Sequence, residues 1–235
     1  MAYGLKILND SLKLQIDSLY QNYALWEHGE GVATVLGSGT YYSKTITFTN
    51  PSAEPPLIAI KPSSARYCGL SNYTRSGSNY TGFVIHSETG QSATIDWMAL
   101  VPRKDKSSEA YGLRVYNAVP ELVFDSGHAP MIIRDVDVVS APWAYTAYVV
   151  VNVAHPSDAN AYFIMSPHGW WQYIVNSYPP VSQGGNWWPM FKYIDAATVS
   201  FGAVLGAVFS IPAPISFSDG YWPSAWTILT VKKAF

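Results

Sequence analysis

The sequence contains one start-like segment twice. MAYGLKILNDSLKLQIDS at the N-terminus aligns without a gap with EAYGLRVYNAVPELVFDS in the middle of the chain, so that Ala2–Ser18 matches Ala110–Ser126. Two copies separated by about a domain's length are typical of a duplication, because a solenoid requires several shorter repeats. The repeat therefore predicts two related units, and a chain of 235 residues is long enough to form them.

Each copy is predicted to form a β-hairpin. In the first copy, apolar residues alternate over 3–7, Asn9 begins a polar turn, and alternation resumes over 14–16. Asp17 and Asp125 stand where the second strand of each hairpin ends. We expect both to act as turn or cap residues, because Asp side chains bond to nearby backbone amides.

The rest of the chain is rich in strand signals. Short β-branched and aromatic runs are separated by clusters of Gly, Pro, Asn and Ser, at 41–50, 56–62, 82–87, 92–102, 131–139, 145–154, 160–166, 199–211 and 226–234. This pattern predicts an all-β fold of two tandem antiparallel β-sandwich-like domains, each opening with a related β-hairpin. RKDKSSE at 103–109 is predicted to be a solvated linker, which gives a first β domain at 1–105 and a second, Trp-rich β domain at 106–235.

The stretch 196–218 contains no charged residue and has Gly202 and Gly206 at GxxxG spacing. One interpretation is a membrane-spanning helix with a dimerisation face. The other is buried strand, since apolar residues occupy alternate positions from Val199 onward and Pro212 lies near the end of the run. The alternation favours strand and turn, with no stable membrane insertion.

Composition limits the partners. Charged residues make up only 13% of the chain and the net charge is −2, so no general attraction to nucleic acid is expected. Cys68 is the only cysteine, which excludes an intrachain disulfide and fits assembly in a reducing compartment. The N-terminus shows no basic segment followed by an apolar one, so we expect no signal peptide.

No motif predicts an enzyme. The sequence has neither a GxSxG nucleophile elbow nor an HExxH zinc motif, and Gly184-Gly185 is followed by neither a lysine nor a helix signal. Asp135 and Asp137 share one strand face and could hold a cation, but Arg134 beside them favours a solvated face. The five histidines lack ligand spacing: His28, His86, His128, His155 and His168. We therefore expect no catalytic residue, metal or cofactor.

Tryptophan is the most informative residue type. Seven of the 9 Trp lie in the second unit, and two adjacent pairs, Trp170-Trp171 and Trp187-Trp188, are expected to surround a Pro-, Gly- and Ser-rich loop. Adjacent strand residues point to opposite faces, so one core accommodates only one ring of each pair. The remaining rings could pack against loops of the same domain, form a subunit interface or stack on a sugar.

The repeated hairpin resembles the N-terminal hairpin of bacteriophage tail proteins of the tail tip, baseplate and fibre. Gly4–Ser18 and Gly112–Ser126 both match the pattern GLxVxNxxxxLxxDS, and Leu12 and Pro120 stand where that group often has Gly. Residues 82–102 also resemble the end of tail-fibre β-sandwich domains, with Gly82-Phe83 before a strand that has a central Trp97.

This resemblance implies a non-enzymatic virion component, assembled in the host cytoplasm and contributing to tail architecture and host attachment. Its expected partners are other tail proteins and further copies of itself, with a trimer favoured. An alternative is a lectin-like protein that recognises host surface polysaccharide through the Trp-rich loops. A polysaccharide depolymerase is a third interpretation, because distant acidic residues could meet in the fold.

Overall fold

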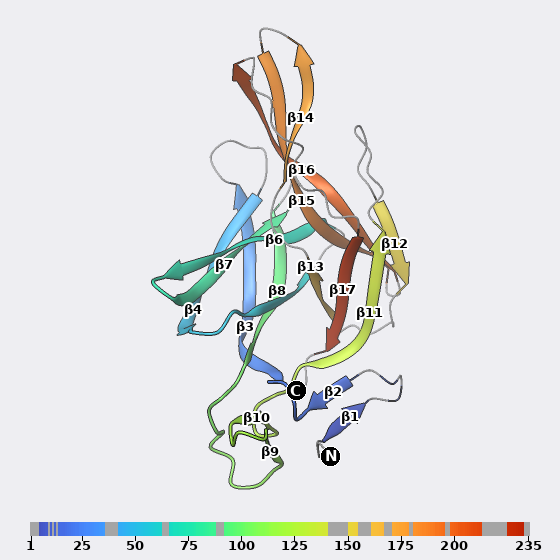
Figure 1. Cartoon of the computed structure of the whole chain (residues 1–235). Helices are drawn as coiled ribbons and strands as arrows, with labels where there is room; N and C mark the ends of the chain where they lie inside the picture. The colour runs from blue at the N-terminus through green and yellow to red at the C-terminus, as the bar shows by residue number, and fades with distance from the viewer. Residues whose placement is uncertain are drawn as a thin grey trace.

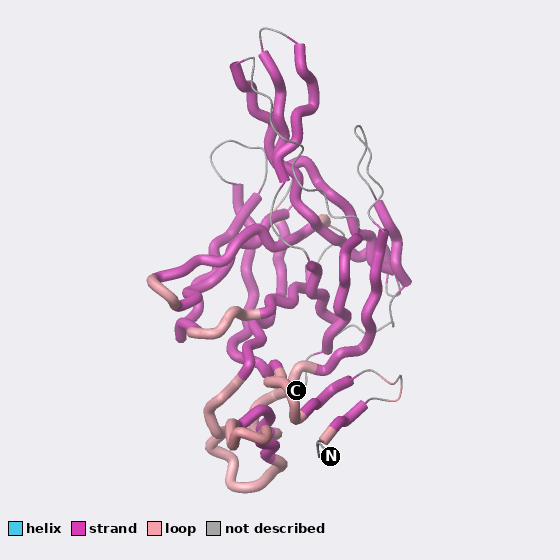
Figure 2. The backbone as a smooth tube through the Cα atoms, in the orientation of Figure 1, coloured by secondary structure: helices cyan, strands magenta, loops and turns pink. Residues whose placement is uncertain are grey.

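The computed structural model describes residues 5–8, 10, 12, 14–35, 42–62, 66–87, 92–140, 150–154, 161–166, 171–178, 181–195, 198–212 and 225–232. Strands and loops make up these ranges, and no helix occurs among them (Figure 2). The all-β prediction is thus confirmed for the described part of the chain. The strands are β1 Lys6–Leu8, β2 Leu14–Asp17, β3 Tyr23–Val35, β4 Tyr42–Ser52, β5 Leu57–Pro62, β6 Cys68–Ser76, β7 Asn79–Ser87, β8 Ala93–Pro102, β9 Arg114–Tyr116, β10 Leu122–Asp125, β11 Ile132–Ser140, β12 Val150–Ala154, β13 Ala161–Ser166, β14 Trp171–Tyr178, β15 Val181–Asp195, β16 Thr198–Pro212 and β17 Ala225–Lys232.

Two antiparallel layers enclose the main core. One layer has the order β11-β17-β13-β5-β8-β3, and the other has β4-β7-β6-β15-β16-β12, with β14 also paired to β15. A short pairing between the end of β3 and the start of β4 joins the layers into one sheet of 13 strands. Phe83 on β7 meets Trp97 on β8 edge-on, with ring centroids 5.3 Å apart. This aromatic contact crosses the interior between the layers, where alternate residues of both layers are buried.

The long strand β3 did not follow from its sequence, because Gly29 and Gly31 interrupt its pattern. Tertiary packing explains both glycines. A Cβ at Gly29 would lie 3.0 Å from the Trp97 ring, and one at Gly31 would lie 2.6 Å from Ile46. Large side chains of the core thus occupy the space above these glycines. The glycines make β3 harder to predict from the sequence, but they allow Trp97 and Ile46 to pack closely against the strand.

Toward its C-terminal end, β8 is buried on both faces of the first layer. Ala93, Ile95 and Trp97 alternate with less buried residues, but every residue from Trp97 to Val101 is buried. Met98 and Leu100 belong to a second core, on the face of the layer away from the first. A continuous apolar run is the sequence pattern that such a doubly covered strand produces.

Pairing in the sheet runs across residue 105. Phe163 on β13 pairs with Ile60 on β5, and Phe191 on β15 pairs with Cys68 on β6. The halves before and after residue 105 are therefore joined through the sheet, and the division into domains at 1–105 and 106–235 stays a prediction. The two short hairpins, β1-β2 and β9-β10, lie outside this sheet at one end of the molecule (Figure 1).

At the opposite end, a three-stranded arm projects from the body (Figure 1). We define the arm as residues 171–178 of β14, 181–187 of β15 and 205–212 of β16, which pair with one another. The strand prediction for 196–218 is confirmed over Thr198–Pro212, and 213–218 lies outside the described residues. The loop expected around Gly184-Gly185 is wrong, because both glycines lie within β15.

Candidate functional site

Three of the four Trp residues chosen from the sequence lie in or beside the arm. Trp171 begins β14 and is the register partner of Trp187 on β15, while the next residue, Trp188, is the partner of Val204 on β16. These three positions lie in strands, which corrects the expectation of Trp-rich loops. Trp170 lies outside the described residues. Whether the rings are core, interface or glycan contacts stays a prediction, and a second candidate site lies at the opposite end of the molecule (Figure 1).

This second site is the pair of hairpins that carry the sequence repeat. β1 and β2 pair Lys6 with Asp17, Ile7 with Ile16 and Leu8 with Leu14, with a bulge after Ile7. β9 and β10 repeat this register at the equivalent positions, pairing Arg114 with Asp125, Val115 with Phe124 and Tyr116 with Leu122. The bulge recurs at the same step. The repeat in sequence is therefore a repeat in backbone structure, and the prediction of two related antiparallel hairpins is confirmed.

The Asp-Ser motif closes each hairpin with the same hydrogen bonds. Ser18 donates its N–H to the Leu5 carbonyl at 3.0 Å, and its hydroxyl accepts the Leu5 N–H at 2.9 Å. Ser126 and Leu113 repeat both contacts at 2.9 and 2.8 Å. A serine at this position satisfies backbone groups that a short two-stranded sheet would leave exposed to water, so the motif defines where each hairpin ends.

The two aspartates of the motif are turn residues, as the sequence predicted. Asp17 accepts the Leu19 N–H at 2.8 Å, and Asp125 accepts the Gly127 N–H at 2.9 Å. Both contacts reach two residues ahead, which is the pattern of an Asx-turn.

The hairpins pack against each other around a small shared core. Ile16 of the first hairpin and Val115, Val123 and Phe124 of the second are buried together, with Ile7 packed against them. An isolated two-stranded hairpin is marginally stable at best in water. Each hairpin therefore supplies the apolar face that the other one needs, and the pair forms a single structural unit.

Asn22 joins the two hairpins by hydrogen bonds. Its amide group donates to the carbonyls of Asp17 and Val123, at 3.0 and 2.9 Å, and its amide oxygen accepts the Asp17 N–H at 3.0 Å. The backbone N–H of Asn22 also donates to Val123 at 3.0 Å. One side chain thus satisfies backbone groups at the end of the first hairpin and in the second strand of the other hairpin.

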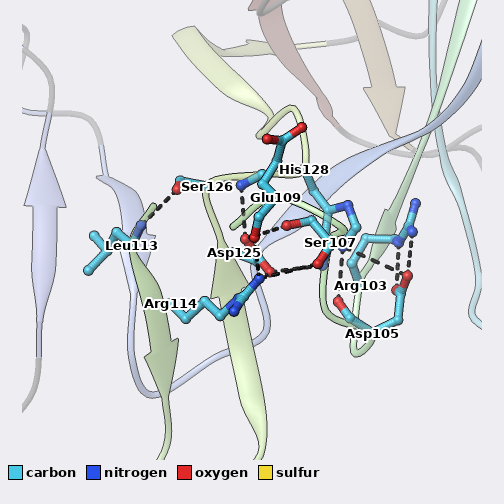
Figure 3. A network of polar contacts seen from close by, with 10 residues as sticks. Arg103, Asp105, Ser107, Glu109, Leu113, Arg114, Asp125, Ser126 and His128 are labelled. Atoms are coloured by element: carbon cyan, nitrogen blue, oxygen red, sulfur yellow. Dashed lines mark hydrogen bonds and ion pairs between the residues drawn. The ribbon is translucent and has the colours of Figure 1, made fainter. Parts of the chain in front are cut away.

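The second hairpin is also fastened by the charged segment 103–109 (Figure 3). Asp125 accepts the Ser107 N–H at 2.9 Å, the Ser107 hydroxyl at 3.0 Å and the Arg114 Nε–H at 2.9 Å. Arg114 donates in turn to the carbonyls of Ser107 and Glu109. The segment that the sequence predicts to be a solvated linker is therefore exposed at Lys104 but bonded to the hairpin at Ser107.

The start of this segment is held against the body. Arg103 forms a two-point ion pair with Asp105, and its guanidinium lies over the Trp26 ring, 4.8 Å from the centroid. His128 lies 2.9 Å from the Asp105 carbonyl through its Nε2 atom. These contacts connect segment 103–109, and through it the hairpin pair, to Trp26 on β3. The hairpins are therefore joined to the sandwich by side-chain contacts as well as by the continuous chain.

Asp125 is the most perturbed carboxyl of this network. Burial of its side chain alone would raise the pKa, but the hydrogen bonds from Gly127, Ser107 and Arg114 lower the pKa well below its usual range. Asp125 therefore stays ionised at neutral pH and accepts four bonds at once. Because all of these partners are groups of the same chain, the arrangement fits a structural fastening and supplies no open position for a substrate.

The hairpin pair also carries most of the exposed apolar side chains in the described part of the molecule. Tyr111 is 94% exposed and Leu12 is 78% exposed. The full set on the two hairpins and their exits is Leu5, Leu8, Leu12, Leu19, Tyr20, Tyr111, Leu113, Tyr116 and Val119; only Val32, Val136 and Val138 are comparable among the other described side chains. Nine of the twelve exposed large apolar side chains among the described residues therefore lie on the two hairpins and their exits, and exposed apolar surface of this kind is typical of protein interaction sites.

Other residues singled out in the sequence do not form a site together. His28, His86 and His128 lie on β3, on β7 and beside the second hairpin, and His155 and His168 lie outside the described residues. Asp135 lies on β11 and bonds to the next backbone N–H at 2.8 Å, and Asp137 follows on the same strand. No group of His, Cys, Asp or Glu that could hold a metal ion occurs among the described residues.

Comparison with known proteins gives no match. The searches of family models, curated proteins and solved structures find none that matches the chain. A search for long apolar helices in the described residues finds none that could cross a membrane.

Sequence reasoning missed Asn22, Ser107 and Arg114. The repeat did mark the Asp-Ser motif, but Asn22 follows the first copy and Ser107 precedes the second. The pairing of Lys6 with Arg114 in the alignment was a usable signal, because each faces the aspartate of its own copy.

Proposed function

We propose that this protein is a structural component of a bacteriophage virion, in the tail tip, baseplate or tail fibre assembly. Its partners are other tail proteins and further copies of itself, with three copies favoured, and its role is tail architecture and host attachment. The observation that carries this proposal is the pair of hairpins. They bear the sequence resemblance, share one hydrogen-bonding pattern and present most of the exposed apolar side chains in the part of the chain that the structure describes.

The hairpin pair is suited to docking on a neighbouring protein. Its backbone is fixed by the shared core and by the bonds of Asp125 and Asn22, so its exposed residues lose little conformational freedom on binding. Tyr20, Tyr111 and Tyr116 supply large amphipathic rings, which are enriched at the centres of interfaces. A rigid, aromatic surface of this kind fits a permanent assembly better than it fits a reversible encounter.

The first test is location. Purified particles of the phage that encodes the chain should contain the protein in fixed stoichiometry by mass spectrometry, and antibodies should label the tail in electron micrographs. Absence from purified particles, when the protein is abundant in infected cells, would contradict the proposal.

A second test uses the hairpin surface itself. Tyr111→Ser with Leu113→Ser should reduce incorporation of the protein into particles by at least tenfold, because both side chains are exposed and their loss leaves the hairpin core intact. Val136→Ser with Val138→Ser, at another exposed apolar site, is the matched control and should leave incorporation unchanged.

Receptor binding through the arm is the second candidate function. The observation in its favour is the register pairing of Trp171 with Trp187, which places both residues at the base of the arm. Binding of the purified chain to a host polysaccharide, lost in Trp171→Ala and Trp187→Ala, would support it.

A further inference from the structure

The arm has two unpaired edges in the described structure. β14 pairs with β15 through one edge, and no described strand occupies its other edge. Within the arm, β16 likewise pairs only with β15, because β12 meets β16 no further along than residues 198–202. Unpaired edges present rows of free N–H and C=O groups, and proteins usually protect them with charges or prolines.

The arm lacks charged protection altogether. Residues 171–178, 181–187 and 205–212 contain no Asp, Glu, Lys, Arg or His, although 13% of the whole chain is charged. Pro212 stands at the far end of β16 and protects no residue before it. An uncharged three-stranded sheet therefore projects from the body (Figure 1). Neither of its outer edges is paired with another described strand, so both edges are able to pair with a strand from another copy.

The two edges suit each other in direction and length. β14 and β16 are both antiparallel to β15, so they run in the same direction. Their registers also coincide, since Ile174 pairs with Gly184 and Gly184 pairs with Phe209, at one level of the arm. When copies are related by rotation about an axis along the arm, the β14 edge of one copy meets the β16 edge of the next in parallel.

We propose that the arm joins copies of this chain, with β14 of one copy pairing with β16 of the next until the ring closes. This inference rests on the self-assembly in the proposed function and assigns it to one segment. A head-to-tail contact of two different edges closes into a ring when the rotation permits, and closure removes every free edge. Three copies give about nine strands, close to the roughly eight whose side chains fill a barrel interior, whereas four would leave it wider.

The composition of the arm agrees with a filled interior. Small residues recur along it, at Gly184, Gly185, Gly206 and Ala207, beside the large residues Phe209 and Ile211. Because the arm has no charged side chain, neither of its faces places a charge inside a closed barrel. A lipid surface is the competing occupant, and the experiment below separates it from a second copy.

The test measures the mass of the full chain by sedimentation at micromolar concentration. A trimer of the 25.9 kDa chain is expected. Val208→Lys and Phe209→Lys are then made separately. Adjacent strand residues face opposite sides of a sheet, so one lysine enters the closed interior and the other points outward. One variant should dissociate into monomers and the other should remain trimeric. Val138→Lys on β11, where the native side chain is 70% exposed, is the control and should remain trimeric.

Folding of the body is monitored separately by thermal unfolding, which should remain a cooperative transition in all three variants, although the dissociated variant should melt at a lower temperature because it has lost the subunit contacts. A monomeric wild type would overturn the proposal, as would dissociation by both arm variants or by neither. Flotation of the wild-type chain with phosphatidylcholine vesicles, lost in an arm variant, would assign the arm to lipid and overturn it as well. If the purified wild-type chain is a monomer but is still found in purified particles, the proposed function stands and only the arm contact is refuted.

Discussion

The two hairpins share a backbone and differ in how they are held. In the first, the Lys6 ammonium lies 3.7 Å from Asp17 and its side chain is 63% exposed. In the second, Arg114 meets Asp125 at 2.9 Å and Ser107 adds two more bonds to the same carboxylate. A conserved register therefore does not require conserved support. The local motif specifies the hairpin, while neighbouring segments decide how strongly each copy is fastened.

The largest expected effect is the loss of Asp125. Asp125→Ala removes an acceptor of four bonds and leaves the Arg114 Nε–H without its charged acceptor, so we expect a loss of about 3 kcal/mol in the free energy of unfolding. The equivalent Asp17→Ala should cost about 1 kcal/mol. Asp17 accepts one hydrogen bond, from the Leu19 N–H, and forms one long ion pair with the exposed Lys6. Urea unfolding of both variants measures the difference, and equal losses would contradict the distinction between the hairpins.

The sandwich and the hairpins are expected to lose stability at different pH values as the solution is acidified. Burial lowers the pKa of His86 to about 4, although a hydrogen bond with the backbone of Tyr42 opposes the shift. The unfolded chain therefore takes up this proton first, and His86 lowers stability as pH falls from about 6.5 to 4, by about 3 kcal/mol in total. Asp125, with its pKa below the usual range, loses its contribution only as pH falls below about 4.

The control for this prediction is His86→Phe. The variant is expected to be less stable at neutral pH but to show a flatter dependence of stability on pH between 6.5 and 4. Denaturant unfolding at a series of pH values measures both slopes, and identical slopes would refute the role of His86.

Asn22 tests whether the hairpins act as one unit. Asn22→Ala removes the side-chain bonds to Asp17 and Val123, and we expect a loss of about 2 kcal/mol. Hydrogen exchange should then increase at the amides of both hairpins together. Exchange that increases only near residue 17 would show that the hairpins are independent.

The smallest expected effect concerns the turn of the first hairpin. Leu12 has φ 59°, in the left-handed region that favours glycine. A leucine in this conformation carries a steric cost that a glycine does not. Leu12→Gly should therefore stabilise the hairpin, by about 0.5 to 1 kcal/mol. Pro120→Gly in the other copy is the comparison and should not stabilise, since Pro already restricts the unfolded chain.

The sequence by itself determined the strand content, the two hairpins and the turn role of their aspartates. These features depend on short-range chemistry: period-two alternation, turn residues and side chains that bond to nearby backbone. It also indicated the apolar run at Thr198–Pro212 as strand, because alternation and proline placement are local signals.

Only the tertiary structure decided the remaining features. β3 became a long strand because Trp97 and Ile46 occupy the space above its glycines, and β15 continued through Gly184 because two neighbouring strands hold it. The packing of the two hairpins, the bridge made by Asn22 and the fastening of Asp125 by Ser107 join residues distant in sequence. Such contacts form only when the whole chain closes around a common core, because the burial and the partners that stabilise them come from segments that no local pattern brings together.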